Sequence, residues 1–333
     1  MIKQISLLTT RNMKLFFRDK GVFFASLITP LILLLLFVTF LGGVYKDSFV
    51  SSLFASGVIS ANKFELLDET VQSYISGYVG ANLLSCLLST ACITVSFCSN
   101  TIMVSDKVSG ARKDLNMTPV RNSVLSLSYF LSSFFVTLIV CFTAMCACFI
   151  YMSATGWYLS VADVFLLLSD VVILTLFGTA FSSVIYIFLS SEGQISAVGT
   201  IISSTYGFIC GAYMPISTFG SGLRKILSFL PGTYGTSLVK NHSMQGVLNE
   251  MLEAGYLNKP ALESIKSAFD MNIFFLDKTS GNPVSIGAMY AIMLSTVVVL
   301  ISLYILLNIL VTKGKIKPKF KNKAQKHSKN VAK

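Results

Sequence analysis

The sequence predicts an all-α membrane protein with six transmembrane helices, an N-terminal interfacial helix and re-entrant outer helices before the last span. Hydrophobic residues make up 53% of its 333 residues and charged residues only 12%, whereas a soluble domain is about a quarter charged. Six apolar stretches of 20 or more residues have the length that a helix needs to cross a bilayer. The predicted transmembrane domain covers residues 22–311, with spans at residues 22–44, 74–104, 124–151, 164–189, 194–213 and 286–311.

Residues 1–21 are expected to form a cytoplasmic helix in the membrane interface. Apolar residues such as Ile5 and Phe16 are interleaved with basic residues such as Arg11 and Arg18, a pattern typical of a helix with one face in lipid. The first span follows directly, and 16 of its 23 residues are Leu, Ile, Val or Phe. Those residues alone favour insertion into the membrane by about 5–10 kcal/mol.

The connections between the spans differ in length and charge. Residues 45–73 are expected to form a short outer loop. Residues 105–122, SDKVSGARKDLNMTPVRN, carry mixed charge, and Thr118-Pro119 ends any helix before the third span. The fourth and fifth spans are joined by a turn of only four residues that contains Glu192.

The outer segment, residues 214–285, divides into an apolar and a polar part. Residues 216–239 contain two half-apolar runs, each too short to cross, so they are expected to dip into the outer leaflet and return. A Pro-Gly pair would reverse the chain between two short helices. Residues 241–282 are polar and should stand outside as a cap. The residues expected to shape the re-entrant segment are Phe219, Leu223, Phe229, Pro231 and Gly232.

Basic residues are unequally divided between the two sides of the membrane. Of the 26 Lys and Arg residues, 18 lie on the side of the termini and 8 on the other. Positive charge in short loops marks the cytoplasmic side, so both termini are expected in the cytoplasm and the protein in the cell membrane. The basic tail, residues 312–333, has nine lysines and should be disordered and attracted to anionic lipid. This placement argues against nucleic acid as a partner.

The sequence has no pattern of an enzyme or a metal site. The seven cysteines all fall within predicted spans without a CxxC pair, and the two histidines have no ligand partner at metal spacing. The stretch GSGLRK at residues 220–225 lacks the Gly-Lys-Ser/Thr of a phosphate loop. We therefore expect no cofactor, metal or catalytic residue on this chain.

Two features inside the spans have more than one interpretation. Asp163 and Asp170 lie in the outer part of the fourth span, where a carboxylate can mark an ion pathway. A solvated or interface-facing carboxylate is the favoured interpretation. Gly207 and Gly211 form a small-xxx-small pair in the fifth span, which predicts a close helix interface, although such pairs also arise by chance in glycine-rich helices.

The order of these parts resembles the membrane subunit of a type-2 ABC exporter, the drug- and polysaccharide-export permease family. The resemblance covers nearly the whole chain. It is carried by RNMKLFFRDK before the Pro-bearing first span, SDKVSGARKDLNMTPV after the second span, and GAYMPIS…LRKILSFLPGTYG after the fifth. It implies a six-span half-transporter that pairs with a second permease copy, identical or different, and with a separate ATPase that binds ATP and Mg. Segment 241–282 departs from the family, because it is longer than in minimal members.

The resemblance also implies roles for particular residues. The loop 105–122 would hold a coupling helix that contacts the ATPase, with contributions from the N-terminal helix and the turn after the fourth span. The transport pathway would lie between two subunits, lined by the first, second and fifth spans, and would carry an amphipathic drug-, peptide- or lipid-like substrate. The expected ATPase-coupling residues are Asp106, Lys107, Gly110, Arg112, Lys113, Asp114, Arg18 and Glu192.

Two alternatives stay open at the level of the sequence. One is a permease for polysaccharide or lipid-linked glycan of the same superfamily. Such channels tend to have aromatic-rich lumens, and Trp157 is the only tryptophan of this chain. The other is a membrane channel or assembly protein that works without ATP.

Overall fold

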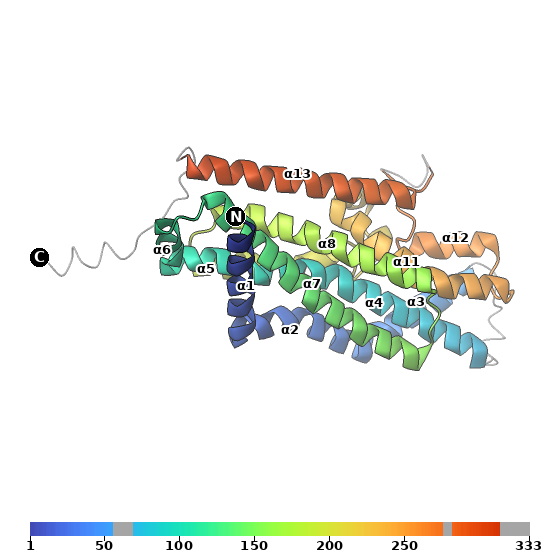
Figure 1. Cartoon of the computed structure of the whole chain (residues 1–333). Helices are drawn as coiled ribbons and strands as arrows, with labels where there is room; N and C mark the ends of the chain where they lie inside the picture. The colour runs from blue at the N-terminus through green and yellow to red at the C-terminus, as the bar shows by residue number, and fades with distance from the viewer. Residues whose placement is uncertain (56–68, 276–281, 314–333) are drawn as a thin grey trace, which may run out of the picture.

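The computed structural model describes residues 1–55, 69–275 and 282–313, and these residues form a bundle of helices without a strand (Figure 1). The predicted basic tail lies outside the described residues from residue 314 on. The elements are α1 Ile2–Arg18, α2 Lys20–Leu36, the π-helical turn η1 Phe37–Leu41, α3 Gly42–Ala55, α4 Glu69–Ser99, α5 Thr101–Ser109, α6 Ala111–Met117, α7 Asn122–Thr155, α8 Val161–Phe188, α9 Glu192–Ile209, the 3-10 turn η3 Ile216–Thr218, α10 Ser221–Leu227, α11 Pro231–Glu253, α12 Lys259–Ala268 and α13 Ile286–Thr312.

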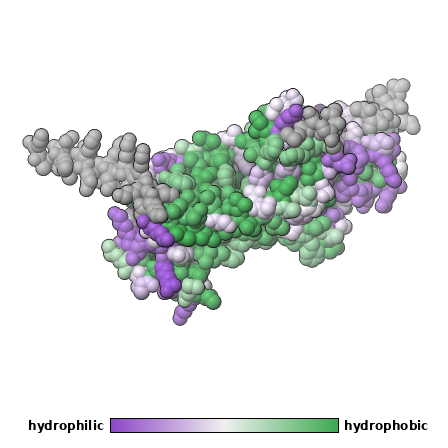
Figure 2. All heavy atoms as spheres, turned by 90° about the horizontal axis from the view of Figure 1, so that it is seen from above, coloured by the Kyte–Doolittle hydropathy of each residue, from purple (hydrophilic) through white to green (hydrophobic). Residues whose placement is uncertain are grey.

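Five helical segments of the described residues are long and apolar enough to cross a membrane, as expected of a multi-pass membrane protein. Figure 2 shows a hydrophobic band along the middle of the visible face, with hydrophilic residues gathered toward both ends. This is the surface that a bilayer requires. The segments coincide with five of the six predicted spans and run over Lys20–Leu53, Glu69–Ser109, Asn122–Thr155, Val161–Phe188 and Ile286–Thr312.

Helix α4 is the centre of the bundle and is buried over most of its length. It packs against α2, α7, α8, α9 and α11. Many of its buried polar residues are Ser and Thr, whose hydroxyls donate to carbonyls of the preceding turn, as from Thr90 to Cys86 (2.8 Å) and from Ser96 to Cys92 (2.6 Å). Small side chains with satisfied hydroxyls let neighbouring helices approach closely. Gly178 of α8 makes such a contact, because a Cβ there would lie 2.8 Å from the Cys92 carbonyl oxygen.

The first span is longer than predicted and contains a π-helical turn. Helix α2, η1 and α3 follow one another without a break, so the predicted outer loop 45–73 begins with helix as far as Ala55. The loop prediction was wrong there because apolar residues of α3 pack on the bundle. Phe49, for example, stacks on Tyr78 of α4 with ring centroids 4.0 Å apart. Residues 56–68 lie outside the described residues.

The predicted fifth span, residues 194–213, is a shorter helix than expected. Helix α9 ends at Ile209 and is not among the five apolar segments. The Ala212 amide donates to the Gly207 carbonyl (2.9 Å) and the Gly211 amide donates to the Phe208 carbonyl (3.3 Å). These paired bonds are a Schellman C-cap, in which the left-handed residue is Gly211, with φ of 76°.

The predicted helix interface through Gly207 and Gly211 is corrected by this geometry. Gly211 lies beyond the end of α9, so the two glycines do not share a helix face. The nearest atoms to a Cβ at Gly207 belong to the ring of Tyr213, which folds back on the same helix. Both glycines therefore shape the end of α9 and the chain reversal after it.

After α9 the chain returns into the bundle through η3, α10 and α11. Helix α11 is one helix of 23 residues with Pro231 at its first position, which proline suits. The prediction of two short helices was therefore wrong for this part. The prediction of a polar cap was also wrong for residues 241–251, because α11 packs against α4, α8 and α13 and buries residues such as His242 and Met251. Residues 276–281 of the predicted cap lie outside the described residues.

We predict that Gly178→Ala lowers the free energy of unfolding by about 1–3 kcal/mol, because the added methyl group would overlap the Cys92 carbonyl and force α8 away from α4. The matched control is Gly199→Ala on α9, where a Cβ would meet nothing within 4 Å. Thermal unfolding of both variants in detergent provides the measurement. A Gly178→Ala melting temperature equal to that of the control would contradict this close contact.

Candidate functional site

Three helices gather at one end of the bundle. Helix α1 lies across this end, and α5 and α6 follow α4 at the same end (Figure 1). Helix α1 is amphipathic and buries Thr9, Asn12 and Phe16, with α7 as its main neighbour. We call the group of α1, α5 and α6 the charged end.

Asp106 of α5 joins three helices at the charged end. Arg11 of α1 donates to its carboxylate with both terminal nitrogens, at 2.5 Å from Nη1 to Oδ2 and 3.2 Å from Nη2 to Oδ1. The Tyr129 hydroxyl of α7 donates to Oδ2 at 2.5 Å. The hydrogen bond to Asp106 raises the pKa of Arg11, so the guanidinium stays charged. Asp106 is 6% exposed, and this charge-assisted bidentate pairing fixes α1 on α5 and α7.

Lys107, the next residue, fastens α5 to the end of α8. Its ammonium donates to the carbonyl oxygens of Tyr186 at 2.9 Å, Ile187 at 3.2 Å and Leu189 at 3.5 Å. The last carbonyls of a helix have no amide partner within the helix and attract a cation. Lys107 thus holds the start of the α8–α9 turn against α5.

Asp106 and Lys107 were predicted to contact an ATPase, and the structure gives both charged groups partners within this chain. Their charged groups point into the bundle and are bonded to neighbouring helices. Sequence reasoning missed these partners because they are distant along the chain. Arg11 is 95 residues from Asp106, and Tyr129 is 23 residues from it.

The other predicted coupling residues are not buried. Gly110 has φ of 88°, a left-handed conformation that glycine adopts without strain, and it turns the chain from α5 into α6. Helix α6 has no buried residue. It therefore presents its charged side chains beyond the Asp106 cluster. The predicted residues whose side chains are exposed or partly exposed are Arg18, Arg112, Lys113, Asp114 and Glu192.

Toward the other end of the bundle, glycines bring α11 close to its neighbours. Gly246 contacts the loop that precedes α8, Gly235 contacts Leu174 of α8, and Gly232 contacts Tyr206 of α9. Helix α11 therefore runs antiparallel to α8, from the start of α8 to its middle. Leu174 lies about 20 Å along the axis from the first residue of α8 at 1.5 Å per residue.

A buried polar cluster connects α8, α11 and α13. His242 Nδ1 lies 2.6 Å from Asp170 Oδ2, and the Tyr290 hydroxyl donates to Asp170 Oδ1 at 2.5 Å. Ser169 Oγ is 3.2 Å from the same hydroxyl. Asp170 is 1% exposed and His242 6%. A buried carboxylate is tolerated only when it is paired and hydrogen-bonded, and this cluster supplies both conditions.

The structure corrects the prediction of a solvated Asp170 and the placement of residue 242 in a polar cap. Asp170 is not solvated, and His242 does not stand in an exposed outer segment. The sequence held one indication of this pair: Asp170 is a carboxylate within a predicted span, and His242 is one of only two histidines that could be its partner. Assigning residue 242 to a polar cap hid their proximity.

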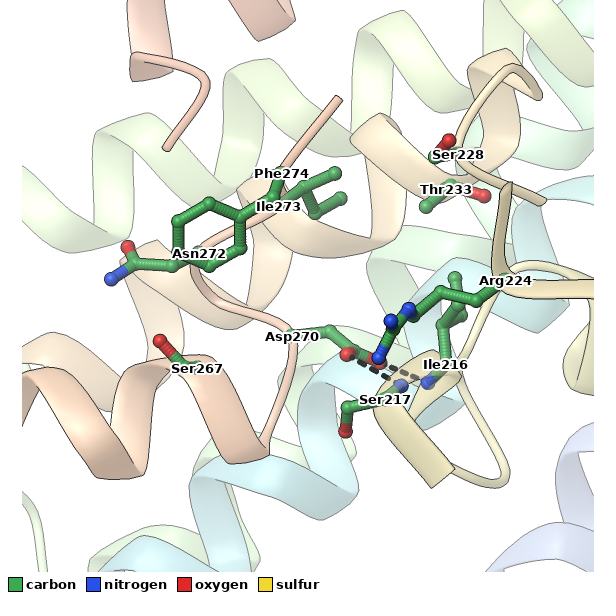
Figure 3. A pocket seen from close by; sticks show the side chains of 10 residues that line it. All are labelled: Ile216, Ser217, Arg224, Ser228, Thr233, Ser267, Asp270, Asn272, Ile273 and Phe274. Atoms are coloured by element: carbon green, nitrogen blue, oxygen red, sulfur yellow. Dashed lines mark hydrogen bonds between the residues drawn. The ribbon is translucent and has the colours of Figure 1, made fainter. Parts of the chain in front are cut away.

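Asp270 ties the chain after α9 to α11 and the end of α12. It accepts hydrogen bonds from the amides of Ile216 and Ser217, the latter at 3.2 Å. Lys240 of α11 is 2% exposed and lies 3.9 Å from the Asp270 carboxylate, and it donates to a backbone carbonyl after α9 at 2.7 Å. Figure 3 shows the pocket beside Ile216, Ser217 and Asp270, with the Arg224 guanidinium directed toward Asp270.

The predicted re-entrant residues occupy different surroundings. Leu223 is 48% and Phe229 58% exposed, whereas Phe219 is partly buried. Pro231 opens α11, and Gly232 makes the contact with α9 described above. In residues 216–239, apolar side chains such as Leu223 and Phe229 are therefore exposed, whereas the part of the segment that lies in α11 is buried.

The described residues contain no group of three or more His, Cys, Asp or Glu side chains that could hold a metal ion. The seven cysteines are free, and five of them are buried as small apolar residues.

The family comparison is consistent with this arrangement of helices. The model of the ABC-2 type transporter family matches residues 3–241, from the start of α1 into α11. None of the curated proteins compared with the chain matches it. The matched region contains the charged end, four of the five apolar segments and α9. The protein is a multi-pass membrane protein of the ABC-2 type transporter family.

Proposed function

We propose that the protein is the permease subunit of an ATP-driven exporter, which forms its pathway with a second permease copy and is driven by a separate ATPase subunit. Membership of a family that generally works with an ATPase subunit supports this proposal. The observation that carries it is the Asp106 cluster, because it joins α1, α5 and α7 and leaves the charged helix α6 exposed beyond them.

Mechanical coupling follows from the same contacts. An ATPase that pushes on α6 would displace α5, to which Gly110 connects it. The Asp106 and Lys107 contacts would pass this displacement to α1, α7 and α8, since packed elements move as rigid bodies. In this proposal Arg112, Lys113 and Asp114 touch the ATPase, while Asp106 and Lys107 are positioning residues.

The charged end would face the cytoplasm. Exposed basic residues on α1 and α6, such as Lys3, Arg18 and Lys113, support this orientation under the positive-inside rule. Both termini would then be cytoplasmic. Helix α9 would be the fifth span in chain order and bring the total to six, and α12 would lie on the outer side of the cell membrane.

Helices α10 and α11 would form a re-entrant roof over the pathway. The support is the position of α11 along α8. Gly246 of α11 contacts the loop before α8, and Gly235 contacts the middle of α8, so the start of α11 lies well inside the bundle. The Asp170 cluster would lock this helix to α8 and α13. A movement of α11 relative to α8 would have to separate His242 from Asp170, whereas α8, α11 and α13 can move together without breaking this contact.

Helix α9 offers a surface for the pathway between two permease copies. Ser196, Thr200 and Ser204 recur every four residues and are exposed, with the Thr200 and Ser204 hydroxyls bonded to their own helix backbone. A hydroxyl-bearing face suits contact with a second helix or a water-filled pathway. Exposed Ile201 and Phe208 on the same helix add apolar area, which suits an amphipathic substrate. Helix α4 was also expected to line the pathway, but it is buried within one subunit.

We predict that Arg112→Gln combined with Asp114→Asn uncouples ATP hydrolysis from export. Loss of a desolvated charge pair at an interface costs about 2–5 kcal/mol, so permease-dependent stimulation of the ATPase should fall at least about tenfold. The control is Lys3→Gln, an exposed change on α1. The measurement is ATP turnover and substrate efflux in liposomes that contain the permease and an ABC ATPase from the same organism.

Two outcomes of this experiment would count against the proposal. A permease that neither co-purifies with that ATPase nor alters its turnover would contradict the assigned function. Normal efflux by the α6 double variant would instead leave its charges with a role in membrane orientation alone.

We predict that an impermeant maleimide added outside labels Ile226→Cys at least about tenfold more slowly than Ser264→Cys, in a background without the seven native cysteines. Both native side chains are exposed in the structure, so the rates compare their surroundings. An apolar residue of a re-entrant segment would be covered by lipid or protein. Ser228 is unsuitable as the reporter because its 4% exposure would slow labelling in either case. Equal, rapid labelling of the two variants would remove the re-entrant segment from the proposal.

We predict a graded loss of stability across the Asp170 cluster. Tyr290→Phe removes one hydrogen bond and should cost about 1 kcal/mol. Asp170→Ala removes the buried partner of His242 and should cost about 3–5 kcal/mol. Thermal unfolding in detergent compares the two variants. Melting temperatures that are the same for both variants would show that the His242 contact contributes nothing beyond the Tyr290 hydrogen bond.

A further inference from the structure

A groove of about 260 Å³ separates the first turns of α7 from the last turns of α13, beside the charged end. Helix α13 packs mainly on α8 and α11, and its contact with α7 is slight. Two hydrogen bonds set the spacing of the groove walls. The Tyr304 hydroxyl donates to the Ser126 carbonyl at 2.9 Å, and the Ser126 hydroxyl donates to Asn308 Oδ1 at 2.8 Å.

The lining of the groove changes from polar to apolar with depth. Ser123 and Lys313 lie at the helix ends that form its mouth, whereas Phe130 and Ile301 lie two to three turns farther in. From Lys313 to Ile301, α13 rises about 18 Å. This depth is comparable to half of a hydrocarbon core that is about 30 Å thick. The groove therefore matches a lipid headgroup at its mouth and an acyl chain in its depth.

Positive charge surrounds the mouth. Lys313 lines the groove, and exposed Arg121 directly precedes α7. Arg112, on α6 at the same end of the bundle, is partly exposed. No Asp or Glu is among the lining residues. The sequence adds eight further lysines after Lys313.

We propose that this groove binds an anionic phospholipid of the adjacent leaflet, with an acyl chain between Leu127 and Ile305 and its phosphate near Lys313 and Arg121. The apolar depth favours a lipid over a free anion, and the cations at the mouth favour an anionic headgroup. The bound lipid adds contacts to the two hydrogen bonds that join α13 to α7. In the orientation proposed above, this is the cytoplasmic leaflet.

Fluorescence quenching by brominated lipids tests this proposal on the full chain in phosphatidylcholine vesicles. Trp157→Phe removes the only native tryptophan, and Leu127→Trp places a reporter in the groove. Phe135→Trp is the matched control, because Phe135 is similarly exposed on α7 but does not line the groove. A second reporter, Ile305→Trp, covers the case in which the residue introduced at Leu127 fills the groove itself.

The groove reporters should be quenched at a several-fold lower mole fraction of brominated phosphatidylglycerol than of brominated phosphatidylcholine, and the control equally by both. Lys313→Gln should reduce that preference about fivefold, as expected when one cation near a lipid surface contributes about 1 kcal/mol.

Three outcomes would overturn the proposal. Equal quenching of the groove reporters by the two lipids would exclude a preference for the anionic headgroup. Quenching of the control but not of either groove reporter would show that protein, either the tail of this chain or a second copy, covers the groove. Loss of the preference in millimolar inorganic phosphate would identify a site for the free anion.

Discussion

Everything in this bundle depends on one constraint: polar groups inside a membrane protein must find their partners within the protein. Helix α4 meets it with small residues. Most buried Ser and Thr hydroxyls of α4 bond to the preceding turn, and Asn100, the residue after α4, donates to Ser182 and Ser183 of α8 at 3.2 and 2.9 Å. Because these side chains are small, satisfying them does not push the helices apart. The helix with many buried polar residues can therefore occupy the centre of the bundle.

The two buried carboxylates outside the α10–α12 region follow one pattern, Asp106 at the charged end and Asp170 near the middle of α8. Asp106 and Asp170 each accept a tyrosine hydroxyl and each pair with a basic side chain from another helix. Each joins three helices that are far apart in sequence. Buried ion pairs are often no more stabilising than apolar residues of the same volume. Their value here is that they specify which helices move together, first α1 with α5 and α7, then α11 with α8 and α13.

The sequence predicted what depends on local properties. Apolar length located five spans, and Thr118-Pro119 marked the end of a helix before the third span. It failed where distant residues decide. A polar composition placed His242 outside, although Asp170 and Tyr290 provide it with a buried site. Likewise Asp106 looked like a surface charge, because nothing near it in sequence identifies Arg11 as its partner.

The π-helical turn Phe37–Leu41 changes which residues of the first span face the bundle. Ser26 and Leu33 before it and Phe37 at its start lie on the buried side, and after it Phe49 and Leu53 do so. A residue advances an α-helix by about 100°, so an uninterrupted helix would set the later residues about a third of a turn away from the earlier ones. The π-helical turn contains one residue more than an α-helical turn, so the buried residues before it and after it lie on the same side of the span. A single amino acid of local irregularity thereby lets one span keep the same neighbour along its whole length.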